Sequence, residues 1–211
     1  MDPYYSDDSV TIYHGDCRDI LPALTFDVIV TDPPYGIAYY PGMHPNGLEF
    51  EPIAGDGDNN LGSWIANHEA PRVVFGADNF AHRLPPGGTW SVWDKRVSPA
   101  ADRILGSPFE LIWAVGHGSR KRHIYRILHC GAVNADKAGQ RRVHPTQKPV
   151  TLMKRIIADH FPTGVIADPF IGAGSTLRAA KDLGRRAVGI EIDERYCEAA
   201  VARLAQEVLA L

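Results

Sequence analysis

Residues 164 to 209 alternate between strand-like and helix-like segments, and this alternation restricts the fold more than any other feature. GVIADPF is predicted to be a strand that enters the glycine-rich turn IGAGST, and TLRAAKDLG a helix that Gly184 can end. RAVGIEID is predicted to be the next strand, and Asp193 can cap a last helix from Glu194 to about Leu209. Parallel strands joined by helical crossovers have this order, so we expect an α/β fold with an open, mostly parallel sheet.

The N-terminal part of the chain adds further strands to this expectation. TFDVIVT is apolar on both faces, as in a strand that helices cover on each side. SVTIYHGD is predicted to be a strand that ends at Gly15 and Asp16, and RDILPAL a short helical turn that Pro22 breaks. Residues 36 to 62 are rich in Gly, Pro and Asn, and a loop of that length is usually functional or disordered.

The middle of the chain predicts three more strands, in PRVVFGADN, GGTWSVWDK and FELIWAVGHG, with a helix over residues 79 to 84. From Thr146 onwards the pattern becomes helical. The residues that share one apolar face of this helix are Val150, Met153, Ile156, Ile157 and His160.

Composition excludes several classes of protein. The chain has 211 residues, of which 45% are apolar, which suits one domain with a sizeable core. No apolar run is long enough to cross a bilayer, and the acidic start lacks the order of a signal peptide. The three cysteines lie far apart, so we expect a reduced, cytoplasmic protein. The nine histidines show no metal-binding spacing, so we expect no metal.

Charge is distributed unevenly along the chain. Residues 1 to 60 hold eleven Asp and Glu against the single Arg18, whereas residues 117 to 148 hold eight Lys and Arg against the single Asp136. The basic segment is suited to phosphates, and a solvated loop is the alternative interpretation. The candidates for phosphate contacts are Arg120, Lys121, Arg122, Arg141 and Arg142.

The glycine-rich turn suggests a cofactor site. Gly172 and Gly174 allow a ligand to approach the backbone closely, and Glu191 ends the next strand, where an acid can accept hydrogen bonds from ribose hydroxyls. Asp168 would repel a pyrophosphate but suits a cationic ligand such as the sulfonium and ammonium end of S-adenosylmethionine. A tight turn without a ligand stays open as an alternative, as does a nicotinamide-dependent oxidoreductase, which would leave residues 32 to 35 unexplained.

The stretch DPPY, residues 32 to 35, follows a predicted strand directly and suggests the chemistry of an amino group. A carboxylate from Asp32 and a carbonyl from Pro33 can both accept hydrogen bonds from an exocyclic amine, which would favour a pyramidal nitrogen with a lone pair free to attack. Pro34 stiffens the loop further, and Tyr35 offers a ring on which an extruded base can stack. A proline-stiffened turn with a capping aspartate is the alternative.

The order of DPPY, HPTQKP (144 to 149) and DPFIGAGST resembles the DNA amino-methyltransferases, in particular their circularly permuted beta class. The resemblance implies a single Rossmann-like methyltransferase domain over residues 1 to 211, with one antiparallel strand in the mostly parallel sheet. It implies S-adenosylmethionine as cofactor and double-stranded DNA as partner, with base flipping and no membrane association. The loop 36 to 62 and the basic segment 117 to 143 would be insertions that face DNA.

The resemblance also assigns residues around the cofactor. YHGDCRDILPAL is similar to the family's adenine-side strand end and would place Asp16 and the Cys17 backbone near the purine. HPTQKP would place Thr146 and Lys148 near the carboxylate of the methionine moiety, and VGIEID carries Glu191 at the ribose. The remaining members of the expected cofactor set are Asp168, Phe170, Gly172, Gly174 and Ser175.

DPPY is typical of the adenine-N6 enzymes of this family, whereas cytosine-N4 enzymes more often have Ser in place of the Asp. We therefore expect adenine methylation, with cytosine-N4 methylation and a DNA-binding module without catalysis as alternatives. The chain lacks the long target-recognition region of larger members and is similar to small phage enzymes. We accordingly expect a short or relaxed recognition sequence, or a homodimer that completes recognition.

Overall fold

The computed structural model describes residues 1–36, 57–58, 60–96, 98, 107–116, 121–130, 133–134 and 147–205. The chain divides into two compact units, the first formed by Met1–Thr31 with Arg142–Leu211 and the second by Asp32–Arg141. We describe each unit by itself. The expectation of a single methyltransferase domain stays a prediction.

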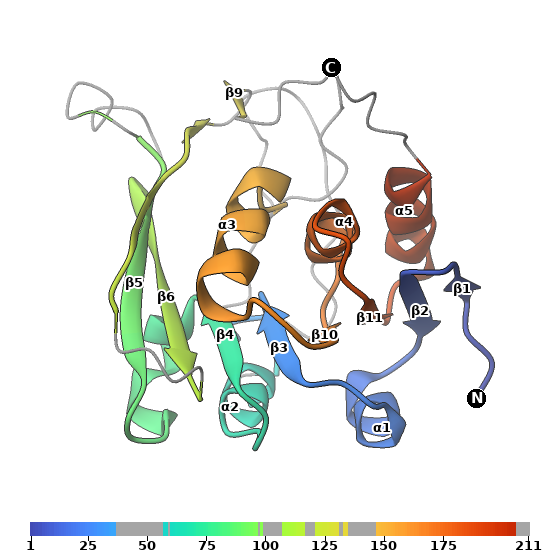
Figure 1. Cartoon of the computed structure of the whole chain (residues 1–211). Coiled ribbons are helices and arrows are strands. Elements are labelled where there is room, and N and C mark those ends of the chain that lie inside the picture. The colour runs from blue at the N-terminus through green and yellow to red at the C-terminus, as the bar shows by residue number, and fades with distance from the viewer. Residues whose placement is uncertain are drawn as a thin grey trace. The chain divides into compact units, whose positions relative to one another are not determined.

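The first unit is built around a sheet with the strand order β1-β2-β11-β10-β3 (Figure 1). Its strands, in chain order, are β1 (Tyr5–Ser6), β2 (Val10–His14), β3 (Val28–Thr31), β10 (Ile166–Asp168) and β11 (Ala187–Glu191). Its helices are α1 (Cys17–Ile20), the 3₁₀ helix η1 (Leu21–Ala23), α3 (Val150–His160), α4 (Ser175–Asp182) and α5 (Glu194–Leu204).

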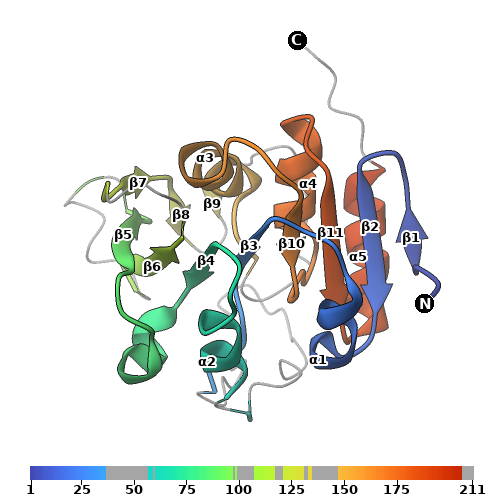
Figure 2. The ribbon, with the colours of Figure 1, turned by 60° about the horizontal axis from the view of Figure 1, so that its bottom comes forward.

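The sheet of the first unit is mostly parallel, as expected. β2, β11, β10 and β3 run parallel to one another, and only the short edge strand β1 runs antiparallel to its neighbour β2. Helices α3, α4 and α5 lie on one face of these strands and α1 lies on the other (Figures 1 and 2). This layering explains why β3 and β10 are buried along their whole lengths.

Several local predictions for this unit are confirmed and others are corrected. Asp193 caps α5 by accepting a hydrogen bond from the Arg195 N–H at 3.0 Å. Pro22 does not break the helical turn, because α1 passes into η1, whose first turn tolerates a proline without an N–H donor. α3 begins at Val150 rather than near Thr146, which lies outside the described residues, and its buried face includes Leu152 in place of the half-buried Val150.

The second unit contains a sheet with the order β4-β6-β5-β7, formed by β4 (Arg72–Phe75), β5 (Thr89–Asp94), β6 (Phe109–Val115) and β7 (Ile124–Arg126). β6 is antiparallel to both β4 and β5, while β7 is parallel to β5. The other elements of this unit are α2 (Leu61–Ala66), the 3₁₀ helix η2 (Ala77–Arg83), β8 (His129–Cys130) and β9 (Val133–Asn134). Among the described strands, β1 and β6 run antiparallel to their sheet neighbours and β8 pairs antiparallel with β9, so more strands are antiparallel than the one expected.

The 3₁₀ helix η2 overlaps the helix expected over residues 79 to 84, but it begins at Ala77 and ends at Arg83. α2 shows that the segment 36 to 62 does not remain a loop to its end, because the helix starts at Leu61. Trp93 and Trp113 are buried in the core of this unit, and Trp93 donates a hydrogen bond to the Ile127 carbonyl at 2.9 Å.

Candidate functional site

Four parallel strands of the first unit end at the same edge of its sheet, and three acidic residues occur at these ends. Asp16 follows β2 and Gly15, Glu191 is the last residue of β11, and Asp168 is the last residue of β10. A backbone hydrogen bond joins the ends of β2 and β11, since the Gly15 N–H donates to the Glu191 carbonyl at 2.8 Å. Ligands of open α/β sheets bind at the carboxyl ends of the strands, so this edge is the candidate binding site of the first unit.

The Glu191 carboxylate is bound to the glycine-rich turn. Its Oε2 accepts a hydrogen bond from the Gly172 N–H at 2.9 Å, and its Oε1 accepts from the Ile192 and Asp193 N–H groups at 3.0 Å. Burial raises the pKa of this carboxyl group, and the backbone donors oppose the rise. The structure thus brings together two expected cofactor-binding residues that are 19 positions apart.

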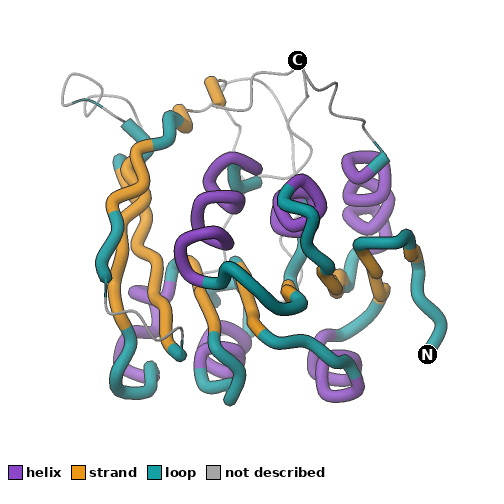
Figure 3. The backbone as a smooth tube through the Cα atoms, viewed as in Figure 1, coloured by secondary structure: helices purple, strands orange, loops and turns teal. Residues whose placement is uncertain are grey.

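Loops such as the one between β10 and α4 are drawn in teal in Figure 3. Within this loop, Gly172 and Gly174 both adopt positive φ, at 46° and 78°. The physical reason for Gly174 differs from the expected one. A Cβ at Gly174 would lie 2.8 Å from the Cβ of Ala200, so the glycine is required for α5 to pack closely against the start of α4. Gly172 keeps the expected position beside an acidic strand end through its bond to Glu191.

Asp168 is 2% exposed, and two donors meet its Oδ1 atom. The Thr31 hydroxyl donates at 2.7 Å and the Phe170 N–H at 3.1 Å. Thr31 was absent from the expected set of site residues. Its only sequence signal is a hydroxyl at the end of the otherwise apolar strand VIVT.

Asp16 caps α1 by accepting a hydrogen bond from the Arg18 N–H at 2.9 Å, and its carboxylate forms an ion pair with the Arg18 side chain at 2.6 Å. Cys17 is 6% exposed, and burial raises the pKa of its thiol to about 12. The thiol therefore stays protonated and is no nucleophile at neutral pH. A contact between a ligand and Cys17 through the backbone, as expected, is compatible with this burial.

Of the remaining members of the expected cofactor set, Thr146 lies outside the described residues, and the other three lie at two places in the first unit. Lys148 is 7% exposed and precedes α3, while Ser175 is buried as the first residue of α4. Phe170 is half-buried in the loop before the glycine turn.

In the second unit, the structure brings together the first and last residues of DPPY. The Tyr35 hydroxyl donates a hydrogen bond to Oδ1 of Asp32 at 2.5 Å. Burial and the nearby carboxylates of Asp32 and Glu110 raise the pKa of Tyr35 well above 10, so the hydroxyl remains a donor at any ordinary assay pH. Pro33 is buried and Pro34 is half-buried between them.

The ring of Tyr35 lies against the backbone of Gly76, the residue that follows β4. A Cβ at this glycine would lie 2.2 Å from Cε1 and Cζ of Tyr35, and its φ of +60° favours glycine independently. Gly76 was not among the expected site residues, although a glycine directly after the strand VVF was a visible signal. The expectation that Tyr35 stacks on a base stays a prediction.

The expected DNA-contacting residues are only in part described. Lys121 and Arg122 are exposed just before β7, whereas Arg120, Arg141 and Arg142 lie outside the described residues, as does most of the segment 36 to 62. Arg126 of β7 is a further exposed cation, with its Nε 3.7 Å from the Asp94 carboxylate.

Carboxylates, backbone amides and the Thr31 hydroxyl are the donors and acceptors described at the sheet edge of the first unit. Glu191 matches ribose hydroxyls, and the buried Asp168 matches a cation but not a phosphate. This chemistry fits S-adenosylmethionine better than a dinucleotide. Among the described residues, no three His, Cys, Asp or Glu side chains are grouped so as to hold a metal ion. None of the helices in the described ranges is long and apolar enough to cross a membrane.

Comparison with known proteins connects this geometry to a family. The family model for N6/N4 methylases, described as DNA methylase, matches residues 77–202, which is more than half of the chain. The match includes the glycine turn and Glu191 but begins after Tyr35.

Two curated relatives resemble almost the whole chain. The type II methyltransferase M2.DpnII of Streptococcus pneumoniae is 25% identical over 97% of this chain and 93% of its own length. The type II methyltransferase M.ScaI of Streptomyces caespitosus is 27% identical over 99% of this chain and 86% of its own length.

Solved structures share the fold. The M1.HpyAVI–SAM complex has a TM-score of 0.58 and 25% identity over 93% of this chain and 100% of that one. The cytosine-N4-specific PvuII DNA methyltransferase has a TM-score of 0.65 at 15% identity, and the match covers 99% of this chain and 90% of that one.

Proposed function

This chain belongs to the N6/N4 DNA methylase family, and on that basis we propose that it transfers a methyl group from S-adenosylmethionine to the N6 amine of adenine in DNA. One observation carries the proposal. The Gly172 amide donates to Glu191, and Glu191 and Asp168 end the adjacent parallel strands β11 and β10, an arrangement that suits a cationic nucleoside. One solved relative, M1.HpyAVI, forms a complex with SAM, which supports the same cofactor.

In this proposal the first unit holds the cofactor. Glu191 accepts hydrogen bonds from the ribose hydroxyls, and Asp168 neutralises the cationic end. When bound, S-adenosylmethionine supplies an electrophilic methyl group on a sulfonium. The residues assigned to the purine and to the methionine moiety are Asp16, Cys17, Thr146, Lys148, Phe170, Gly172, Gly174 and Ser175.

The second unit supplies the residues for the amine. Asp32 and the Pro33 carbonyl accept hydrogen bonds from the exocyclic NH₂, which leaves the nitrogen lone pair available for in-line attack. Tyr35 stacks on the flipped base, and Pro34 limits the motion of the loop. The Tyr35 hydroxyl now donates to Oδ1 of Asp32, so the amine has to share or displace that bond.

Cytosine-N4 methylation is the second candidate, because the same family includes both activities. The DPPY sequence favours adenine. The fold is no guide here, since the cytosine-N4-specific PvuII enzyme shares it at only 15% identity.

Nucleoside analysis tests the proposal and separates the candidates. DNA incubated with the protein and S-adenosylmethionine is digested to nucleosides, and the products are identified by mass spectrometry. We expect N6-methyladenine with the wild type and none with Asp32→Ala, whose cofactor affinity stays close to that of the wild type. N4-methylcytosine would select the second candidate, and the absence of both products would leave a DNA-binding module without catalysis.

Phosphate contacts are proposed for the exposed pair Lys121 and Arg122, together with Arg120, Arg141 and Arg142. Replacing Lys121 and Arg122 by Gln should reduce the slope of log K against log salt concentration by about 2. An unchanged slope would exclude this pair from the interface.

The homodimer that was expected as one way to complete recognition stays a prediction.

A further inference from the structure

Thr31 is a polar residue at the end of a strand that is otherwise apolar. β3 reads Val-Ile-Val-Thr, and all four residues are buried, with Thr31 at 0% exposure. A buried hydroxyl is costly unless it is hydrogen-bonded, and valine has nearly the same shape and an equal preference for strands. The hydroxyl at this position therefore requires an explanation beyond packing.

The partner of this hydroxyl is the Asp168 carboxylate. Thr31 Oγ1 donates to Asp168 Oδ1 at 2.7 Å, a contact between residues 137 positions apart. β3 and β10 are adjacent parallel strands with Ile166 opposite Val28, which brings the two strand ends to the same edge of the sheet. The Phe170 N–H donates to the same oxygen at 3.1 Å.

Two donors from different directions restrict the rotation of a carboxyl group. The Phe170 N–H belongs to the loop that follows β10, whereas the Thr31 hydroxyl comes from the neighbouring strand. Without the hydroxyl, the Asp168 side chain would lose the donor that joins it to β3. Thr31 is also covalently bonded to Asp32, the residue proposed to accept the amine.

We infer that Thr31 is a positioning residue, which orients the Asp168 carboxylate toward the cationic end of the cofactor. The inference rests on the proposed function, because it takes S-adenosylmethionine as the ligand of the first unit. It goes beyond the proposed function by giving a role to a residue that the proposed function does not use.

The test compares Thr31→Val, which keeps the shape and removes the donor, with Thr31→Ser, which keeps the donor. Calorimetry measures the affinity of each variant for S-adenosylmethionine and for methylthioadenosine, which has the ribose and sulfur but no amino-acid end. We expect T31V to lose roughly tenfold in affinity for S-adenosylmethionine, the effect of one lost hydrogen bond to a charged group. T31S should stay within about threefold, and methylthioadenosine should bind equally to all variants.

A double-mutant cycle distinguishes an effect of Thr31 that acts through Asp168 from a general loss of structure. In an Asp168→Ala background, T31V should cause no further loss of S-adenosylmethionine affinity, because its effect acts through the carboxylate. Three results would each overturn the inference. T31V could lose the same affinity for both ligands, it could keep the wild-type affinity for S-adenosylmethionine, or its loss of affinity could add to that of Asp168→Ala in the double variant. A wild-type protein that binds S-adenosylmethionine but modifies no base would contradict the proposed function alone.

Discussion

The hydroxyl of Tyr35 donates a hydrogen bond of 2.5 Å to the Oδ1 atom of Asp32, within the four residues proposed to receive the amine. The oxygen atom proposed to accept the substrate amine therefore already accepts a hydrogen bond from Tyr35. In the proposed reaction, an amine that replaces this donor would form a bond of similar kind with the Asp32 carboxylate.

This relationship predicts the effect of Tyr35→Phe, which retains the ring and removes the donor. Binding of the target base no longer requires displacement of the hydroxyl. The KM for DNA should therefore fall by roughly tenfold, the effect of one lost hydrogen bond to a charged group, while kcat changes less than about threefold. Steady-state kinetics with a short duplex measures both, and Tyr35→Ala is the control that also loses the ring. A Y35F variant as inactive as Asp32→Ala would contradict the assignment.

A second prediction concerns the contact between Gly76 and Tyr35. Gly76→Ala adds a Cβ only 2.2 Å from the Tyr35 ring, whereas Gly87→Ala, at a φ of +89°, meets nothing within 4 Å. Both substitutions carry the backbone cost of alanine at positive φ, about 1–2 kcal/mol. The free energy of unfolding of G76A, measured by urea denaturation, should fall by a further 1–3 kcal/mol, roughly the cost of overpacking. Adding Tyr35→Ala should remove this excess, and equal losses for G76A and G87A would disprove the contact.

The packing of α4 against α5 leads to a third prediction. Gly174→Ala would place a Cβ 2.8 Å from that of Ala200, while Gly184→Ala, at a similarly positive φ, enters open space. G174A should therefore be less stable than G184A by about 1–3 kcal/mol in thermal or urea unfolding. Ala200→Gly should recover part of that difference in the double variant. If it recovers none, the strain lies elsewhere in the turn.

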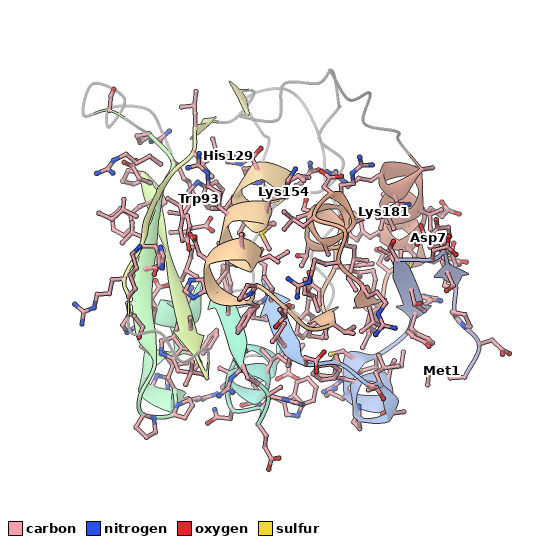
Figure 4. All side chains as sticks on the ribbon, in the orientation of Figure 1. Met1, Asp7, Trp93, His129, Lys154 and Lys181 are labelled. Carbon is pink, nitrogen blue, oxygen red and sulfur yellow. The ribbon has the colours of Figure 1, made fainter. Side chains whose placement is uncertain are left out.

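The fourth prediction concerns pH and the ion pair between Asp7 and Lys181, whose charged atoms are 2.6 Å apart (Figure 4). Burial raises the pKa of Asp7, but hydrogen bonds from Lys181 and from the Ser9 and Val10 N–H groups outweigh it and hold the pKa well below 3.8. Because the folded-state pKa is depressed, the stabilisation is present above pH 3.8 and is lost as the pH falls toward the folded value.

Asp7→Asn should accordingly lower the free energy of unfolding at neutral pH by about 1–3 kcal/mol, and by less at about pH 3. Urea denaturation at both pH values measures the change, with the exposed Asp8→Asn as the matched control. A loss that is the same at both pH values would show that the effect of Asp7 does not depend on its charge.

Features that depend on residues close together in the chain could be predicted from the amino-acid order alone. The β10–turn–α4 and β11–α5 units, the Asp193 cap and the parallel order of the strands follow from glycine positions, capping residues and apolar periodicity. Backbone sterics and local hydrogen bonds act over a few residues, so a single sequence records them directly.

Which distant residues meet depends instead on the three-dimensional arrangement. The Thr31–Asp168 hydrogen bond joins residues 137 positions apart, and Gly174, at the start of α4, packs against Ala200 of α5. Strand register and helix packing set these contacts, and one residue of displacement would turn a side chain to the other face of its strand. The glycine pattern therefore indicated that Gly174 was needed, but the reason, close packing on α5, became visible only in the folded chain.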